Sequence, residues 1–274
     1  MGPRATILPI SLYHHHCPVY LIQRPVTGPN PRAERRKRNG WLRVKIPLMK
    51  ISGDLADGLF ARRLNRFAAE IEVEGQFALA HVPNSGRMRE LLVPGARVLL
   101  VARSGSRKTA FDLVMVAHEE RWLGLDARLP VYLLEEALHS GLVDLGPFHS
   151  IRREVPFGDS RLDLLGVGSG APCLIEVKSV NLVRDGVALF PDASTSRGTR
   201  HLLELRRAVA EGYSASVVFV VQRDDAHCLR PFEAADPLFA STLRGVAPYV
   251  QALAYACEVT RGCIRIIRGI PVEL

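Results

Sequence analysis

Three charged side chains stand in an otherwise apolar stretch, residues 162–180: Asp163 in its first half, Glu176 and Lys178 in its second. Gly, Ser and Pro at 168–172 separate two apolar runs, a pattern that predicts a β-hairpin. Glu176 and Lys178 would share one face of that hairpin, because side chains two apart in a strand point the same way. Burying two carboxylates and an ammonium is costly unless they pair or hold a metal. The hairpin is therefore a candidate site.

The chemistry open to these residues is metal-assisted phosphoryl transfer. Carboxylate oxygens suit Mg²⁺ or Mn²⁺, and a metal on Asp163 and Glu176 would activate water, with Lys178 orienting it or neutralising charge. Asp163 followed by Glu176-x-Lys178 has the form of the PD-(D/E)xK nuclease signature. The alternative is a surface strand with an ion pair. The apolar flanks favour the site, because exposed strands usually alternate more regularly.

A carboxylate pair, Glu135 and Glu136, lies on a predicted helix over 130–145. Pro130 suits the first turn, and an apolar stripe runs along the helix to Gly141. The two carboxylates lie near that stripe, so one of them could turn toward the hairpin. The alternative is a solvated helix face.

A basic cluster opens a second predicted helix, 196–211, with Arg197, Arg200 and His201 in its first turns. A helix start presents free N–H groups and the positive end of the helix dipole. These three side chains are therefore candidates to bind a phosphate. A solvated basic helix start is the alternative reading.

Short strands dominate residues 50–125. Apolar or alternating segments separated by turn residues lie at 63–73, 77–82, 96–103 and 111–118. Such strands with one small helix fit an OB-fold barrel, which often binds single strands through a basic groove. Arg63, Arg66 and Arg87 are available for that purpose, whereas the few phenylalanines are better suited to the core.

A mixed α/β layer is predicted for the remainder of the chain. The continuous apolar run 215–221 is typical of a central strand covered on both faces. A helix at 236–246 and strands at 250–259 and 263–267 follow it. This order of elements favours a sheet with helices against it.

The positive charge of the chain is concentrated in its first 48 residues. That segment holds nine of the 36 Lys and Arg but one of the 28 Asp and Glu, so the rest carries 27 of each. It also has seven of the 18 prolines. We expect residues 1–48 to be a disordered extension, with Met49 nearer the working start. Because the remainder is neutral, net charge is no evidence for nucleic-acid binding.

The five cysteines show no paired spacing, which indicates reduced thiols rather than disulfides or a zinc site. No apolar run reaches membrane-spanning length, and the amino terminus lacks the pattern of a secretion signal. We therefore expect a cytoplasmic protein with no membrane partner.

Six ordered motifs resemble the sugar fermentation stimulation protein A family, and the likeness covers about residues 50–274. They are VPNSGRM (82–88), SRLDLL (160–165), EVKSVNLV (176–183), ALFPDASTSRGTRHLLEL (188–205), VVFVVQRDDA (217–226) and IPVEL (270–274).

The resemblance implies an α/β fold, α+β overall: an OB-like barrel at 49–126, followed by a mixed-sheet PD-(D/E)xK nuclease-like domain at 127–274. It also implies DNA binding with little sequence specificity in a bacterial or archaeal cytoplasm. Asp163, Glu176 and Lys178 match the nuclease core motif. Glu136 matches the helix carboxylate of such nucleases, with Glu135 as the alternative.

Two functions from different classes remain open. The first is a Mg²⁺- or Mn²⁺-dependent phosphodiesterase acting on DNA or RNA, with Asp163 and Glu176 as metal ligands. The second is a non-catalytic DNA-binding regulator of sugar-utilisation genes that retains the nuclease fold. A structural ion-pair network is a third reading of the charged hairpin. The sequence shows no interface signature, although oligomers are common among nucleases of this type.

Overall fold

The computed structural model describes residues 19–22, 42–45, 48–105 and 107–274. Within the basic extension, strand β1 (Val19–Ile22) pairs antiparallel with strand β2 (Leu42–Lys45). The other residues of the predicted disordered segment 1–48, except Leu48, lie outside the described ranges. No helix in the described part of the chain is long and apolar enough to cross a membrane.

The first domain is a closed β-barrel, as the sequence predicts. Its strands are β4 (Leu55–Asn65), β5 (Ala68–Val73), β6 (Gln76–His81), β7 (Arg97–Ala102) and β8 (Phe111–His118). They pair in the order β6-β5-β4-β7-β8, and a short parallel pairing of β6 with β8 closes the ring. Strand β9 (Arg121–Gly124) extends the sheet beyond β8. Alternate side chains of the strands fill the interior.

The predicted strand 63–73 is wrong, because the chain turns back within it. Asn65 Oδ1 accepts the N–H of Phe67 at 2.9 Å, an Asx turn that joins β4 to β5 as an antiparallel hairpin. The strand before the turn also begins earlier than the sequence pattern indicates, at Leu55. The turn, residues 65–67, therefore projects from the barrel as a tip.

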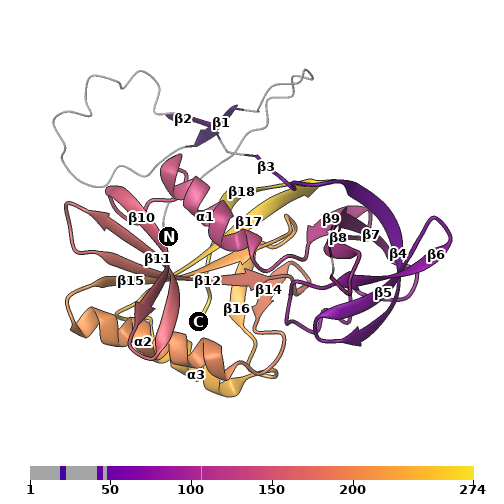
Figure 1. The fold of residues 1–274 in the computed structure, drawn as a ribbon. Coiled ribbons are helices and arrows are strands. Elements are labelled where there is room, and N and C mark those ends of the chain that lie inside the picture. The colour runs from indigo at the N-terminus through magenta and orange to yellow at the C-terminus, as the bar shows by residue number, and fades with distance from the viewer. Residues whose placement is uncertain (1–18, 23–41, 46–47, 106) are drawn as a thin grey trace.

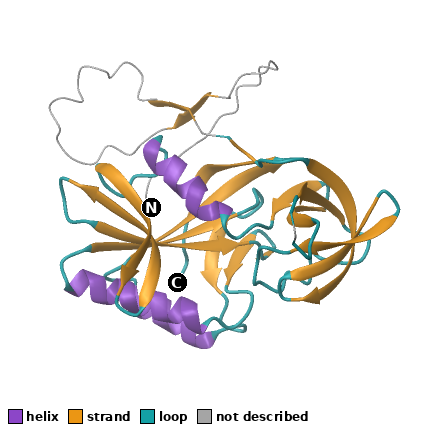
Figure 2. Ribbon diagram, in the orientation of Figure 1, coloured by secondary structure: helices purple, strands orange, loops and turns teal. Residues whose placement is uncertain are grey.

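The second domain contains two sheets and three helices (Figures 1 and 2). The larger sheet has seven strands in the order β10-β11-β12-β15-β17-β18-β3. These are β10 (Phe148–Phe157), β11 (Ser160–Gly168), β12 (Cys173–Val180), β15 (Ser214–Val221), β17 (Gln251–Thr260), β18 (Cys263–Ile270) and β3 (Met49–Lys50). The smaller sheet consists of β13 (Val183–Arg184), β14 (Val187–Phe190) and β16 (Cys228–Pro231).

Helices cover both faces of the larger sheet (Figure 1). Helix α1 (Leu129–His139) packs its apolar side on one face, together with Ile175 and Val177 of β12. Helices α2 (Ser196–Ala210) and α3 (Pro237–Val246) pack on the opposite face, together with Leu174 of β12. Because side chains alternate along a strand, the even-numbered residues of β12 all face α2. The mixed α/β layer predicted from the sequence is confirmed.

Buried amides join the two domains. Asn84, beyond the end of β6, donates to the carbonyl of Leu125 at 2.8 Å and to Oδ1 of Asn181 at 3.3 Å. Asn181 in turn donates to the carbonyl of Gly124, and Gln222 donates to that of Asp126 at 3.2 Å. Loss of any of these amides would break a buried hydrogen bond to a backbone carbonyl. The barrel is therefore held against the sheet by specific contacts.

A second attachment precedes the barrel. Strand β3 pairs with β18, Met49 against Ile264 and Lys50 against Cys263, so these residues belong to the sheet of the second domain. The sequence prediction places these two residues in the barrel domain, which it expects to begin at residue 49. That boundary is wrong, because they pair with strand β18. The barrel is thus bounded in sequence by two segments that contact the same sheet.

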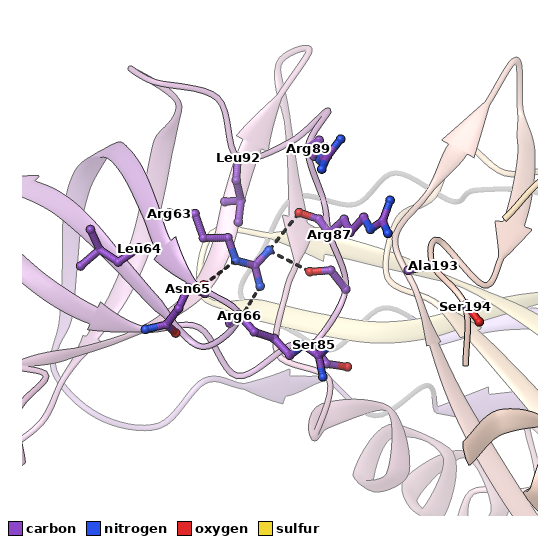
Figure 3. Close-up of a pocket in the computed structure, with 11 residues that line it drawn as sticks. Arg63, Leu64, Asn65, Arg66, Ser85, Arg87, Arg89, Leu92, Ala193 and Ser194 are labelled. Carbon is purple, nitrogen blue, oxygen red and sulfur yellow. Dashed lines mark hydrogen bonds between the residues drawn. The ribbon is translucent and has the colours of Figure 1, made fainter. Parts of the chain in front are cut away.

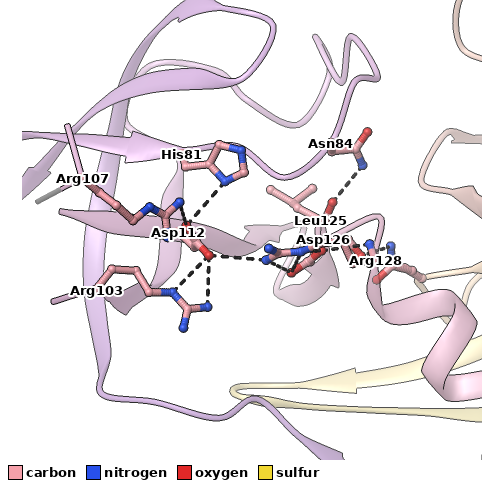
Figure 4. Close-up of polar contacts among 9 residues, drawn as sticks. His81, Asn84, Arg103, Arg107, Asp112, Leu125, Asp126 and Arg128 are labelled. Atoms are coloured by element: carbon pink, nitrogen blue, oxygen red, sulfur yellow. Dashed lines mark hydrogen bonds and ion pairs between the residues drawn. The ribbon is translucent and has the colours of Figure 1, made fainter. Parts of the chain in front are cut away.

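One buried carboxylate pairs with several arginines at the end of the barrel nearest residues 126–128, which lead into α1 (Figure 4). Asp112, 1 % exposed, lies 3.0 Å from Arg103, 3.2 Å from Arg107 and 3.4 Å from Arg128. Arg128 also contacts Asp126 at 2.6 Å. Burial alone would raise the pKa of Asp112, but the arginine charges outweigh it and hold the pKa below 3.8. The cluster fixes the β7–β8 loop to the segment that leads into α1.

Candidate active site

The hairpin of β11 and β12 brings the charged residues together, as the sequence predicts. The two strands pair antiparallel, with Leu164 opposite Ile175. In this register Asp163 lies beside the start of the Glu-x-Lys segment, and its Oδ2 accepts the N–H of Val177 at 2.7 Å. Glu176 and Lys178 follow on the face of β12 that meets α2. Asp163 and Glu176 are thus adjacent across the hairpin.

Glu176 is almost fully enclosed, with 3 % of its surface exposed. Its Oε1 accepts two hydrogen bonds, from Lys178 Nζ at 2.6 Å and from His201 Nδ1. Its Oε2 is buried and has no hydrogen-bond partner among the residues that the structure describes. One oxygen of the carboxylate is therefore held in place while the other is left for a further ligand.

His201 is buried and hydrogen-bonded to the carboxylate of Glu176, so it does not face the surface. The ring is 2 % exposed, and its Nε2 lies 3.3 Å from Nε of Arg197, which can only donate. Nε2 must then accept, so Nδ1 carries the proton that is donated to Glu176. The predicted role of His201 in binding phosphate is not supported by this position. Arg197 remains exposed at the start of α2.

Burial and mutual repulsion set the electrostatics of the two acids. Burial, followed by the neighbouring charge of Glu176, raises the pKa of Asp163 to about 7. Burial would also raise the pKa of Glu176, but the charge of Lys178 and the hydrogen bond from His201 lower it below its ordinary value. Two adjacent carboxylates that resist being charged together are a suitable receptor for a divalent cation.

The paired carboxylates are the oxygen donors available for the predicted Mg²⁺ or Mn²⁺. Within the described ranges, no group of three or more His, Cys, Asp or Glu side chains is arranged to hold a metal. The two carboxylates nevertheless fit a cation that keeps several waters and takes one or two carboxylates. Asp163 uses one oxygen for Val177, and the unpartnered Oε2 of Glu176 is a further donor.

Glu136 does not join this site, contrary to the sequence prediction. It lies on α1, whose buried residues pack against Ile175 and Val177, on the face of the sheet opposite Glu176. Burial, followed by the charge of Glu135, raises the pKa of Glu136 from its ordinary value. Neither carboxylate of α1 lines the cleft that contains the hairpin residues. The spacing of α1 from the hairpin along the chain could not show which face the helix covers.

The hairpin residues open into a cleft of about 660 Å³ between the two domains. Asp163, Glu176 and Lys178 line it from the sheet, and Arg197 lines it from the start of α2. Residues 66–67 and 84–86 of the barrel and 191–195 of the β14–α2 loop also line it. Arg200, the remaining basic residue predicted at this helix start, is exposed and lies 3.4 Å from Oγ of Ser160.

Arg63, predicted to bind nucleic acid, is instead committed to the backbone (Figure 3). Its guanidinium donates to five carbonyls, those of Asn65, Arg66, Asn84, Gly86 and Arg87. These carbonyls belong to the β4–β5 turn and to the loop after β6, so one side chain fixes both. No donor of the guanidinium remains for a phosphate.

Asp192 makes a contact between the domains that residue spacing alone does not reveal. Its Oδ2 accepts the backbone N–H of Arg87 at 2.7 Å, across the boundary between the domains. A Cβ at Gly86 would lie 2.7 Å from the same oxygen, so any larger residue there would require the carboxylate of Asp192 to shift. The only sequence signal was that Asp192 and Gly86 both lie in the family motifs.

Two family models match consecutive parts of the chain. The model for the SfsA N-terminal OB domain matches residues 61–125, and that for the sugar fermentation stimulation protein RE domain matches residues 128–262. Among curated proteins, a sugar fermentation stimulation protein homolog from Moorella thermoacetica is 43 % identical over 234 residues, covering 83 % of this chain and 100 % of the relative. The chain belongs to the sugar fermentation stimulation family.

Other members of the sugar fermentation stimulation family agree with this assignment. The homolog from Desulforamulus reducens is 40 % identical over 223 residues, which cover 81 % of this chain and 93 % of the relative. The structure of Pyrococcus furiosus SfsA in complex with Ca²⁺ matches with a TM-score of 0.77 and 27 % identity, covering 82 % of this chain and 100 % of that one. The family resemblance and the fold predicted from the sequence are confirmed.

Proposed function

We propose that this protein is a metal-dependent phosphodiesterase acting on DNA or RNA. The observation that carries the proposal is the pair of half-buried Asp163 and buried Glu176, which lines a cleft between two domains beside Lys178. Adjacent carboxylates with an uncommitted oxygen, next to a lysine, form the donor set of a metal-assisted hydrolase. A site for binding alone would gain nothing from acids that face phosphates.

Asp163 and Glu176 would hold Mg²⁺ or Mn²⁺. When bound, the cation would supply Lewis-acid polarisation of the phosphate and activation of a water. His201 has a positioning role, since its hydrogen bond to Oε1 of Glu176 fixes which oxygen faces the cleft. The Nζ of Lys178, 2.6 Å from that carboxylate, would orient the attacking water and stabilise charge developing on the phosphate.

The Pyrococcus furiosus relative supports a cation in this family, because its structure is described as a complex with Ca²⁺. Ca²⁺ and Mg²⁺ are both hard cations that prefer oxygen ligands. Burial, followed by repulsion from Glu176, raises the pKa of Asp163, and a cation on the paired carboxylates would offset both effects. We extend this property to the present chain as part of the proposal.

The proposed substrate is a polyanion held by arginines at the edges of the cleft. Arg66 and Arg197 line the cleft from the barrel and from α2 respectively. Phosphate contacts of this kind carry little sequence information, so we expect weak specificity. We place the activity in the cytoplasm, and the cysteines of the described residues, all free, fit a reducing compartment.

A binding-only regulator is the second candidate, and one observation favours it. The α1 carboxylates lie on the far face of the sheet. Of the three described acids that line the cleft, Asp192 accepts the N–H of Arg87 with one oxygen, which leaves Asp163 and Glu176 as the pair beside Lys178. In that case the chain would bind DNA without cutting it.

Cleavage assays on the full chain decide between the two candidates. Labelled single- and double-stranded DNA and RNA would be incubated in Mg²⁺, Mn²⁺ or EDTA with the wild type, Lys178→Ala and Glu176→Gln. Glu136→Gln is a matched control, because it neutralises a carboxylate on the opposite face. The proposal expects metal-dependent cutting by the wild type and by Glu136→Gln, and no cutting by Lys178→Ala or Glu176→Gln. Binding without cutting in every metal would favour the regulator.

A further inference from the structure

A basic groove of about 570 Å³ continues from the cleft onto the barrel (Figure 3). The groove and the cleft share residues of the β4–β5 turn, the loop after β6 and the β14–α2 loop, namely Arg66, Ser85, Gly86, Ala193 and Ser194. Because the linings overlap, an extended ligand could pass from one into the other. Nothing in the proposed chemistry requires this extension.

Three arginines of the groove are not used by the fold. The guanidinium groups of Arg66, Arg87 and Arg89 line the groove, and all three residues are exposed. None of the three guanidinium groups makes a hydrogen bond or ion pair with another residue in the part of the chain that the structure describes. In Figure 3 the side chains of Arg87 and Arg89 point away from the guanidinium of Arg63. Three positive charges are therefore available to an anion.

The backbone that carries two of these arginines is held in advance. Arg63 donates to the carbonyls of Arg66 and Arg87, one on each side of the groove. Asp192 accepts the N–H of Arg87 from the second domain. A ligand would therefore meet a spacing of charges that is already set, which lowers the entropy lost on binding.

The outer face of the barrel is a poor alternative for a polyanion. In many OB-folds the second and third strands bind oligonucleotides, and here these are β5 and β6. Ala69 and Ile71 of β5 are buried, so Glu70 and Glu72 point outward. Glu70 is paired with Arg62 at 2.8 Å, which also removes that arginine as a phosphate ligand. The carboxylates on this face would repel phosphates.

An exposed aromatic ring lies where the groove meets the cleft. Phe67 follows Arg66 in the β4–β5 turn, lines the cleft and is 49 % exposed. A phenyl ring beside an arginine is the usual platform for an unpaired base. A base within a duplex is already stacked on its neighbours and would not be available to this ring.

We propose that the groove binds a single-stranded stretch of nucleic acid that flanks the proposed cleavage site. Arg66, Arg87 and Arg89 contact its phosphates, and Phe67 stacks on a base next to the cleft. This inference rests on the proposed function for its substrate class. It adds which strand form is bound and which residues bind the part of the strand outside the cleft.

The test is the affinity of the full chain for a labelled single-stranded DNA 12-mer, measured by fluorescence anisotropy at several salt concentrations in EDTA and in Ca²⁺. The variant Arg87→Ala/Arg89→Ala removes two groove charges. Its matched control, Arg184→Ala/Arg206→Ala, removes two charges that instead stack on Phe232 and Tyr249. Thermal unfolding of each variant checks that it is folded.

Each phosphate contact on a single strand contributes about 0.7 to the slope of log K against log salt. The groove variant should therefore lower that slope by about 1.4 relative to the wild type, and the control variant should leave it unchanged. Phe67→Ala should weaken single-strand binding about fivefold or more. A duplex of the same sequence should be unaffected by Phe67→Ala.

An equal slope for the groove and control variants would overturn the proposal, as would wild-type protein that binds no single strand. Equal losses for single strand and duplex with Phe67→Ala would also overturn it. The proposed cleavage fails separately: a groove that behaves as expected, without cutting in any metal, would leave the binding inference intact. Metal-dependent cutting, together with a groove variant whose salt slope equals that of the wild type, would support the proposed cleavage and overturn the binding inference.

Discussion

Replacing Arg63 by lysine should destabilise the protein although it keeps the charge. The guanidinium donates in several directions at once to the β4–β5 turn and the loop after β6. A lysine ammonium has three donors on one atom and cannot reproduce this planar fork. The backbone of both segments would lose a common partner. We therefore expect Arg63→Lys to lower the free energy of unfolding, whether or not a ligand is bound.

The magnitude follows from which carbonyls are shielded from water. The bonds from Arg63 to Gly86 at 2.8 Å and to Asn84 at 3.0 Å are partly buried, whereas the other three are exposed and water can replace them. Losing two partly buried bonds from a charged donor, at about 1 to 1.5 kcal/mol each, lowers the free energy of unfolding by about 2 to 3 kcal/mol. For a chain of this size that corresponds to a fall in Tm of about 4 to 12 °C.

Thermal unfolding of Arg63→Lys, followed by circular dichroism, measures this change. Arg66→Lys is the matched control, because it lies in the same hairpin and has no side-chain partner among the described residues. The control should change the free energy of unfolding by less than about 0.5 kcal/mol. Equal Tm values for the two variants would show that Arg63 does not hold the loops together.

Asp112→Asn should lower the free energy of unfolding by about 2 kcal/mol at pH 7, because three arginines lose a buried partner. The pKa of Asp112 is lowered, so urea titrations should show the difference from wild type shrinking as the pH falls below 3.8. Asn181→Ala should also lower the free energy of unfolding measured in urea, by about 1 to 3 kcal/mol, because the carbonyl of Gly124 loses its donor. His201→Ala should weaken Ca²⁺ binding in calorimetry about 10- to 100-fold, and an unchanged affinity would contradict its positioning role.

The core of the site could be predicted because its geometry is local. Asp163, Glu176 and Lys178 lie on one hairpin, and the two-residue period of a strand determines which side chains share a face. The turn residues at 168–172 indicated where the chain reverses. The buried strand β15 was likewise evident from its unbroken apolar run.

The errors concern contacts between segments distant in sequence. Glu136 was assigned to the site because it matches the helix carboxylate of PD-(D/E)xK nucleases, but the sheet face that a helix covers depends on packing across the whole domain. Arg63 has the same sequence signature as a phosphate-binding arginine, and only the approach of a loop more than twenty residues away shows otherwise. For His201 a signal existed: the neighbouring stripe of Leu202 and Leu205 places this part of α2 against the sheet.

The two attachments of the barrel have a consequence for motion within the molecule. A domain joined by one linker can swing about it, but here β3 before the barrel pairs with β18 of the larger sheet. The segment 124–126 after the barrel is bonded to Asn181 and Gln222, which follow β12 and β15 of the same sheet. Rotation is then limited to small displacements about the line joining the two attachments. The width of the cleft should accordingly be nearly constant. The proposed nucleic-acid strand would then reach the carboxylates by sliding along an open groove, and no closure of the two domains around it would be needed.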